Sequence, residues 1–149
     1  MPNIVIKIPE GVFGSLGVQH LAERVTVAAK QVEQIGDDPR HLFLTWIAVE
    51  EIKPGCLFAG GADPLAQVIP VIVFFYPPAG VIDQDRRAEA VRLIHEAVAS
   101  AKPADDPRPV MTSVIITEVE DGSWGANGAV WRLPEIARAA GYKHLRHLV

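Results

Sequence analysis

Few residues in this chain of 149 have a type and a spacing that suit chemistry. Cys56 is the only cysteine, so we expect neither a disulfide framework nor a cysteine metal site. Four of the five histidines lack metal-ligand spacing with other ligands, so we expect no metal: His20, His95, His144 and His147. Pro2 is different, because it stands directly behind Met1 and directly ahead of a strand-like run, Asn3–Ile8. Chain ends fray unless something ties them down, so this start needs an explanation.

The composition is that of an ordered globular protein. Hydrophobic residues make up 49% of the chain and charged residues 21%, and this length suits a single domain with a substantial core. The net charge of −4 argues against general nucleic-acid binding, which needs clustered Lys and Arg. No apolar run approaches the roughly 20 residues of a membrane span. We therefore expect a cytoplasmic protein that binds neither nucleic acid nor membrane.

The chain contains an internal repeat at an offset of 68 residues. The segment Pro2–Pro9 matches Pro70–Pro77, because both begin and end with proline around six strand-like residues. The tetrapeptide Asp-Asp-Pro-Arg occurs at residues 37–40 and again at 105–108. Two pairs of single residues also match at this offset: Glu50 with Glu118, and Gly60 with Gly128. Together these matches indicate a duplication.

Each half of the repeat predicts a strand, a helix and a second strand. The second strands are expected within residues 42–52 and 110–119. Ser15 and Asp83 are the expected helix N-caps, and Asp-Asp-Pro should close each helix, because a residue before proline is pushed out of the helical region. Apolar residues at helical spacing form two stripes: Val18, Leu21, Val25, Ala28, Val32 and Ile35, then Val91, Ile94, Val98 and Ala101.

These units predict an α+β fold, a tandem β-α-β repeat whose four-stranded sheet carries two helices on one face. Residues 1–149 form a single domain, with repeats at 2–69 and 70–137 followed by a C-terminal tail. The other face of the sheet is expected to be apolar, and a bare apolar face must be covered, so we predict an oligomer. The segment Leu133–Val149 is expected to form a short helix after Arg132 and a tail available to wrap a neighbour.

The start Pro-Asn-Ile-Val-Ile-Lys-Ile-Pro-Glu-Gly resembles the tautomerase superfamily, whose members begin with proline, a short strand and a Glu-Gly turn. The segment Thr112–Gly125 is similar to the second strand and hairpin of 4-oxalocrotonate tautomerase. Two fused units resemble the malonate semialdehyde decarboxylase, cis-3-chloroacrylate dehalogenase and macrophage migration inhibitory factor groups. The resemblance covers roughly residues 2 to 131 and implies a homotrimer.

The resemblance implies a role for Pro2. In that family the methionine is removed, and the amine of the terminal proline lies in an apolar pocket as a general base and acid. Burial disfavours the charged amine, and a base that is active near neutral pH can both take and return a proton. Pro70 holds the equivalent place in the second unit, but its nitrogen is an amide, so we expect one amine site per chain. If Met1 is retained, Pro2 is blocked.

The sequence departs from the family at the arginines that hold carboxylate substrates. The stretches Gly11–Phe13 and Tyr76–Val81, where one arginine belongs, contain none. The second arginine falls near Ser113 in one half and near Thr45 or Trp46 in the other. Because bidentate arginine is the usual way to hold a carboxylate, we expect less charged substrates. Possible replacement cations are Lys7, Arg40, Arg86 and Arg108, although an exposed surface charge is the alternative interpretation of each.

Other site residues follow from the resemblance. Trp124 matches the aromatic residue that lines the family's pocket, with a core residue as the alternative. Tyr76 ends a strand beside the expected pocket, where its hydroxyl could donate to a developing enolate oxygen. His41 lies near the acid of the decarboxylase group, and Asn127 is expected in a turn. The candidate substrate-binding residues are therefore Tyr76, Trp124, His41, Ser113, Lys7 and Arg40.

The resulting hypothesis is a tautomerase or related isomerase that moves a proton in a small keto–enol substrate without a cofactor. Two alternatives stay open. One is a cofactor-free decarboxylase or hydratase of a small oxo or unsaturated acid, in which a cationic Pro2 acts as the acid. The other is a non-catalytic binding protein that has kept the fold and lost the chemistry.

Overall fold

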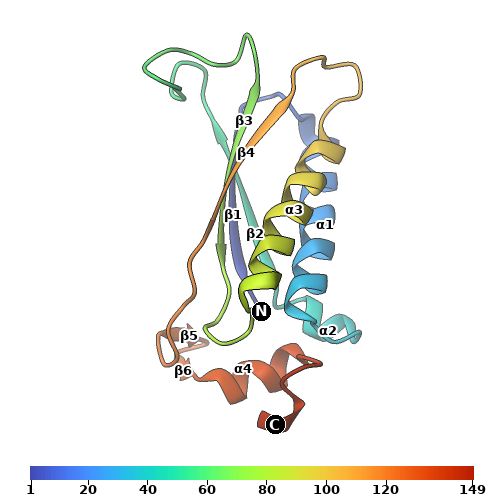
Figure 1. Ribbon diagram of the computed structural model, residues 1–149, viewed down its shortest axis with the longest axis vertical. Helices are drawn as coiled ribbons and strands as arrows, with labels where there is room; N and C mark the ends of the chain where they lie inside the picture. Colours follow the sequence, from blue (N-terminus) through green and yellow to red (C-terminus); the bar gives the residue numbers. More distant parts are fainter.

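Each half of the chain folds into a strand, a helix and a second strand (Figure 1). The computed structural model describes residues 1–149. The first half contains β1 (Asn3–Pro9), α1 (Gly14–Glu33), the short α2 (Pro39–Leu42) and β2 (Trp46–Ile52). The second contains β3 (Ile69–Tyr76), α3 (Gln84–Ala101) and β4 (Val110–Ile116). The chain ends with β5 (Trp124–Ala126), β6 (Ala129–Trp131), α4 (Leu133–Ala140) and the 3-10 turn η1 (Arg146–Leu148).

The four long strands form one sheet in the order β2-β1-β3-β4. Strands within a half are parallel. The two halves join where the first strand of each, β1 and β3, pair with each other antiparallel. Val5 pairs with Phe74, the repeat counterpart of Ile6, and Ile6 pairs with Val73, the repeat counterpart of Val5, so the join is symmetric. Both long helices cover one face of the sheet, as Figure 1 shows. The predicted fold class is confirmed.

The register corrects one of the repeat matches. Lys7 pairs with Glu50 in the first half, whereas the counterpart of Lys7, Phe75, pairs with Ile116 in the second. Glu50 therefore corresponds in space to Ile116, and its match with Glu118 at an offset of 68 is a coincidence. The connection from helix to second strand is two residues shorter in the second half, and this moves the strand relative to the sequence offset.

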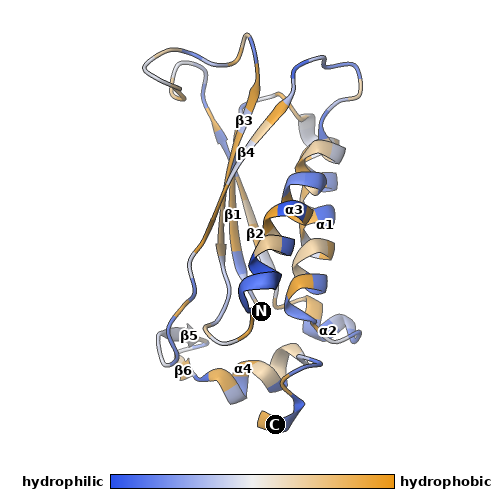
Figure 2. Ribbon diagram, viewed as in Figure 1, coloured by the Kyte–Doolittle hydropathy of each residue, from blue (hydrophilic) through white to orange (hydrophobic).

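The core lies between the sheet and the helices, and burial alternates along the strands because successive side chains point to opposite faces. Every second residue of β1 and β3 is buried there, including Ile6 and Val73. The apolar stripe of α1 is buried from Leu21 to Ile35, and Figure 2 shows the hydrophobic colouring along these elements. Val91 was predicted in the core but is exposed, and Ala90 takes its place because α3 presents a slightly rotated face.

The helix ends differ from prediction in two places. Asp83 caps α3 as expected by accepting from the Arg86 amide at 2.9 Å, but Ser15 caps nothing, because α1 already begins at Gly14. Asp-Asp-Pro does not close the helices. Instead α1 ends at Glu33, where Gln34 has a left-handed φ of 51°, and Asp38 then caps the separate helix α2.

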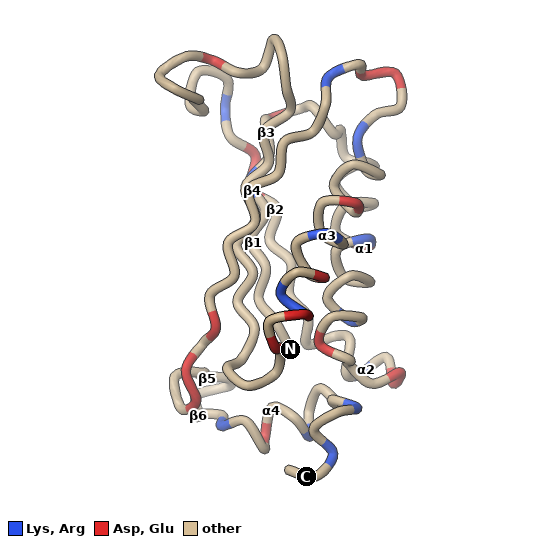
Figure 3. The backbone as a smooth tube through the Cα atoms, in the orientation of Figure 1, with Lys and Arg blue, Asp and Glu red and all other residues tan.

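The sheet face opposite the helices is uncovered in the single chain. Strands β3 and β4 carry no charged residue (Figure 3), and the open face presents Phe74, Met111 and Ile115, of which the last two are 60% and 45% exposed. The main polar feature of this face is the pair between Lys7 and Glu50 at 2.5 Å. No helix has the length and apolar character that crossing a membrane requires.

Candidate active site

Pro2 lies buried where three strands meet. Its carbonyl accepts from the Trp46 amide at 3.1 Å, which fixes the start of β1 against β2. The next residue, Asn3, pairs with Trp46 on one side and with Tyr76, the last residue of β3, on the other. The chain therefore begins inside the fold, as the anchored first strand predicts.

A cavity of about 190 Å³ adjoins the N-terminus. All three tryptophans of the chain line it, although they come from β2, β5 and β6: Trp46, Trp124 and Trp131. Met1 also lines this cavity, and its polar side chains are the amides of Asn3 and Asn127. No Lys, Arg, Asp or Glu contributes to the wall, so the cavity has the character of an uncharged aromatic site.

A second cavity of about 360 Å³ lies on the other side of Trp124. Tyr76, Ser123 and Asn3 line it together with the Trp124 ring, so two of the predicted substrate-binding residues come together beside the first strand. Tyr76 stacks on Phe74 with ring centroids 6.4 Å apart, which fixes the ring at the end of β3. Because Asn3 and Trp124 line both cavities, the two spaces share part of their walls. Pro2 itself lines neither cavity, but its neighbours do: Met1 and Asn3 line the first, and Asn3 also lines the second.

The hairpin β5–β6 is what brings Trp124 to this position. Its turn uses Asn127 and Gly128 with φ of 51° and 80°, left-handed values that asparagine and glycine tolerate. The segment before the hairpin is tied to the end of β3, because the Val119 amide donates to the Pro77 carbonyl at 2.9 Å. Trp124 is thereby held buried against the start of β1, and the turn predicted at Asn127 is confirmed.

The terminal amine of Met1 is buried and bound by two side chains that the sequence analysis missed. It donates to Glu33 Oε2 at 2.6 Å and to the hydroxyl oxygen of Tyr142, and the Tyr142 hydroxyl donates to Glu33 Oε2 at 2.7 Å. The exposed fractions of Met1, Glu33 and Tyr142 are 4%, 0% and 1%. Burial lowers the pKa of the Met1 ammonium, while the Glu33 carboxylate opposes this effect.

The C-terminal segment brings Tyr142 to the N-terminus. α4 ends at Gly141, which has φ of 60°, and the chain then docks on the end of α1. The Gly36 amide donates to the Ala140 carbonyl at 3.1 Å, and the Lys143 amide donates to the Gln34 carbonyl at 3.0 Å. The helix after Arg132 is as predicted, but in this chain the tail covers its own N-terminal end (Figure 1).

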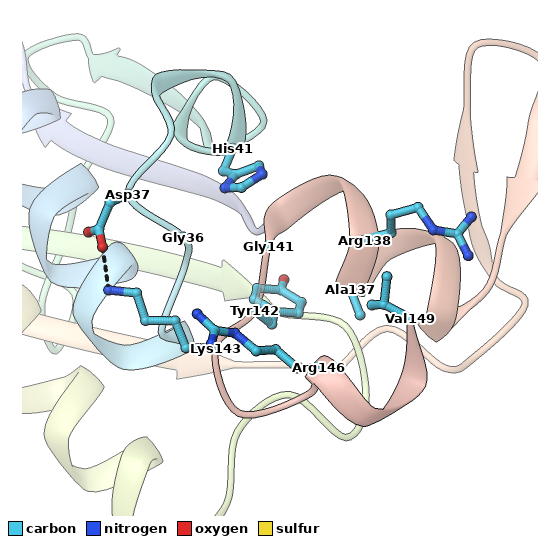
Figure 4. A pocket seen from close by; sticks show the side chains of 10 residues that line it. All are labelled: Gly36, Asp37, His41, Ala137, Arg138, Gly141, Tyr142, Lys143, Arg146 and Val149. Atoms are coloured by element: carbon cyan, nitrogen blue, oxygen red, sulfur yellow. Dashed lines mark ion pairs between the residues drawn. The ribbon is translucent and has the colours of Figure 1, made fainter.

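His41 lines a third cavity of about 420 Å³, at the outer side of the docked tail (Figure 4). Its ring packs against Gly36 and Gly141, where an added Cβ would overlap it, and its buried Nδ1 has no hydrogen-bond partner. Tyr142 lines the same cavity, but Pro2 and the tryptophans do not. His41 is therefore placed behind the Glu33–Tyr142 pair rather than in the aromatic cavity.

The remaining predicted site residues lie outside the two cavities beside Pro2. Lys7 pairs with Glu50 on the open sheet face, and Ser113 lies exposed on the same face of β4. The Arg40 guanidinium is exposed and binds Asp38 of its own turn at 2.5 Å. The other possible replacement cations, Arg86 and Arg108, donate to the carbonyls of Val32 and Leu65. No three His, Cys, Asp or Glu side chains are placed to hold a metal ion.

Solved structures share this arrangement. A fused 4-OT described as a wild-type asymmetric trimer is 18% identical with a TM-score of 0.69, and the match covers 93% of this chain and 98% of that chain. Pt0534 inactivated by 2-oxo-3-pentynoate is 13% identical with a TM-score of 0.68, over 86% of this chain and 94% of that one. N1, a member of the cis-3-chloroacrylic acid dehalogenase family, is 12% identical with a TM-score of 0.66, over 86% and 82%.

No family model matches the sequence, and no curated protein matches it. The likeness to solved structures therefore carries the comparison, and at these identities it establishes the fold. The chain has the two-unit fold of the fused 4-OT structures.

Proposed function

We propose that the chain, once Met1 has been removed, moves a proton in a small keto–enol substrate with the amine of Pro2. The observation that carries the proposal is the buried start of β1 beside a cavity walled by the three tryptophans. Pro2 is buried between Met1 and Asn3, which both line this cavity, and its carbonyl accepts from the Trp46 amide, so its position is fixed.

The chemistry that suits this place is proton exchange at carbon. Pro2 exchanges a proton with the carbon next to a carbonyl group, which interconverts the keto and enol forms. Burial disfavours a charged amine and therefore lowers its pKa toward neutral pH, where one group can serve as both base and acid. Tyr76 is the proposed donor to the enolate oxygen, because it lines the cavity that shares Asn3 and Trp124 with the aromatic cavity.

The walls of the two cavities favour a planar substrate that carries little charge. Neither wall contains Lys or Arg, so a carboxylate in either space would lack the bidentate partner that usually holds it. Aromatic rings attract flat apolar groups with an offset stack or an edge contact. We therefore propose aromatic keto–enol compounds with at most one carboxylate, such as phenylpyruvate, ahead of dicarboxylates.

The proposed assembly is a homotrimer. Its support is the open apolar face of the sheet, which needs a cover, and the description of a fused 4-OT structure as a trimer. Packing of three such sheets with their open faces turned toward a common axis would cover Phe74, Met111 and Ile115 from solvent.

A second candidate is the cofactor-free decarboxylase or hydratase, in which Pro2 starts as an acid. Glu33 favours it, because a buried carboxylate beside the terminal amine stabilises the charged form of that amine. The absence of a cation from the cavity walls weighs against it, since its substrates are acids.

The first experiment measures the ketonisation of phenylpyruvate enol by the wild type, whose processed N-terminus is checked by mass spectrometry. Pro2→Ala should lower kcat/KM at least about tenfold, which corresponds to about 1.4 kcal/mol of transition-state stabilisation. Pro70→Ala is the matched control, because Pro70 holds the equivalent place with an amide nitrogen, and it should leave the rate unchanged.

A wild type that matches the uncatalysed rate would overturn the proposal for this class of substrate and favour the non-catalytic binding protein. Equal losses in Pro2→Ala and Pro70→Ala would also contradict it, because they would indicate damage to the sheet rather than loss of an amine.

A further inference from the structure

We propose that Glu33 and Tyr142 are positioning residues for the terminal amine, and that in the chain without Met1 they hold the Pro2 ammonium, so that Pro2 enters the reaction as a proton donor. The inference rests on the proposed function and sets the order of its two proton steps. The Pro2 N–H bond breaks as a C–H bond forms on the enol, and the enol hydroxyl proton returns to the Pro2 nitrogen.

The first step of the argument is the state of Glu33 in the unprocessed chain. Its carboxylate is completely buried at the end of α1, and Oε2 receives both the Met1 ammonium and the Tyr142 hydroxyl. Oε1 has no partner. A buried carboxylate without a cation is costly, so loss of Met1 leaves a strong demand for a new positive charge at this place.

The second step is that no other cation takes this role. Lys30 and Lys143 both bind Asp37, at 3.0 Å and 2.8 Å, and Arg86 of α3 donates to the Val32 carbonyl. None of these side chains donates to Glu33, so the terminal amine is its one ionic partner in the chain.

The two neighbouring histidines are also directed elsewhere. His144 Nε2 lies 2.9 Å from the Val81 carbonyl oxygen, and its ring centroid lies 5.9 Å from that of Tyr142. His41 packs against Gly36 and Gly141 on the far side of Tyr142. Neither ring has a hydrogen bond to the Glu33 carboxylate.

The third step is reach. The nitrogens of adjacent residues are separated by only three covalent bonds, so the Pro2 nitrogen lies within about 4 Å of the position of the Met1 amine. The Pro2 carbonyl is bound to the Trp46 amide, which keeps the new terminus at this end of the sheet. A change of the Glu33 rotamer or one bridging water closes the remaining gap.

Tyr142 completes the arrangement. Burial and the nearby Glu33 carboxylate raise the pKa of Tyr142, so its hydroxyl stays protonated and keeps donating to Glu33. This donation fixes the carboxylate in one orientation and leaves its remaining lone pairs for the amine. The pair therefore places a negative charge beside the terminal amine, while the aromatic cavity that Met1 lines has no charged side chain in its wall.

The test titrates the Pro2 nitrogen directly by NMR, in processed protein labelled with ¹⁵N-proline. We expect the wild-type midpoint above pH 7. Glu33→Gln should lower the midpoint by at least one pH unit, a tenfold change in proton affinity, and Glu33→Asp should restore part of it. The control is Glu23→Gln, an exposed carboxylate of the same helix that binds only Gln19, and it should leave the midpoint unchanged.

A wild-type midpoint below pH 7 overturns the inference without any variant, which keeps the test decisive if Glu33→Gln does not fold. Equal midpoints in folded wild type and Glu33→Gln also overturn it. The titration uses no substrate, so it separates the two proposals. A Glu33-dependent midpoint with an inactive wild type rejects the proposed function alone, whereas a Pro2-dependent activity with a Glu33-independent midpoint rejects this inference alone.

Discussion

Tyr76 and Trp124 are the two predicted substrate-binding residues that line the cavities adjoining the start of β1. Trp124 lines both spaces, and Tyr76 lines the larger one at the end of β3. The structure thus gives these two residues a common location that the sequence assigned only through resemblance. It does not bring Lys7, Arg40 or Ser113 to the same place.

Tyr76→Phe tests the hydroxyl without removing the ring. If the hydroxyl donates to the enolate oxygen, kcat should fall about tenfold while KM changes little, because a hydrogen bond formed mainly in the transition state affects kcat. Steady-state kinetics with phenylpyruvate enol measures both constants. Arg40→Ala is the control, and a larger loss there than in Tyr76→Phe would contradict the assignment.

Glu33 and Tyr142 show where inference from a single sequence stops. They are 109 positions apart, and no repeat, spacing or motif relates them. One signal was available: Glu33 directly follows Val32 of the apolar stripe and falls four residues after Ala29 on the buried face of α1, where a carboxylate has no favourable partner in the helix. A partner from outside the helix was therefore required, but the position of the tail had to be known to name it.

At the scale of elements, the repeated Asp-Asp-Pro-Arg segments form the same local structure in both halves. The Asp38 carboxylate accepts from the Arg40 amide at 2.8 Å, and the Asp106 carboxylate accepts from the Arg108 amide at 3.0 Å. In each turn the arginine side chain also binds the same aspartate. The repeat was found in the sequence, but its role was misassigned, because an Asp-Pro pair that ends a helix and one that begins a new turn look alike.

The second of these turns should make stability depend on acidic pH. Hydrogen bonds from Arg108 lower the pKa of Asp106 from 3.8 to about 2, so its contribution is complete above the unfolded pKa and is lost as the pH falls from about 4 to 2. Asp106→Asn should have a lower Tm than the wild type at pH 7. This difference in Tm should become smaller below pH 3, where the wild-type carboxylate is itself becoming protonated. Scanning calorimetry at several pH values measures this.

The control for that series is Asp105→Asn, which changes an exposed carboxylate with no hydrogen bond to Arg108. A Tm loss at Asp105 equal to that at Asp106 would mean that net charge, not the turn, sets the acid dependence. Arg108 also donates to the Leu65 carbonyl at 2.8 Å and so anchors the segment between β2 and β3. Limited proteolysis of the wild type and Asp106→Asn therefore adds a second measurement, and this segment should be cleaved faster in the variant.

At the scale of the molecule, the apolar character of β3 on both of its sides is sufficient to predict an apolar open face of the sheet. Ile4, Ile6 and Ile8 face the helices, while the alternate positions of β3 and β4 leave apolar side chains on the open face. The strand order and the antiparallel join of β1 and β3 did not follow from the repeat alone. A duplicated unit can join its copy through either edge, and the choice depends on packing across the whole sheet.

Ile115→Glu tests whether the open face is an interface between copies. A charge on an apolar face that becomes buried on assembly is unfavourable, so the variant should shift from three chain masses toward a smaller species in analytical ultracentrifugation. Val27→Glu is the control, because Val27 is 62% exposed on α1, away from the open face. A wild type that sediments as a single chain of 16.2 kDa would reject the trimer.

The symmetric join of β1 and β3 also bears on the history of this chain. Two separate copies of one unit would have had a free proline nitrogen at each end of the sheet, and fusion converted the second of these, Pro70, into an ordinary peptide bond. Natural selection can then treat the two ends differently. The end that holds Pro2 is enclosed by a short hairpin and a docked tail, whereas residues 53–68 at the opposite end form a long, largely exposed excursion. Among descendants of the fusion, insertions and substitutions should accumulate at the Pro70 end.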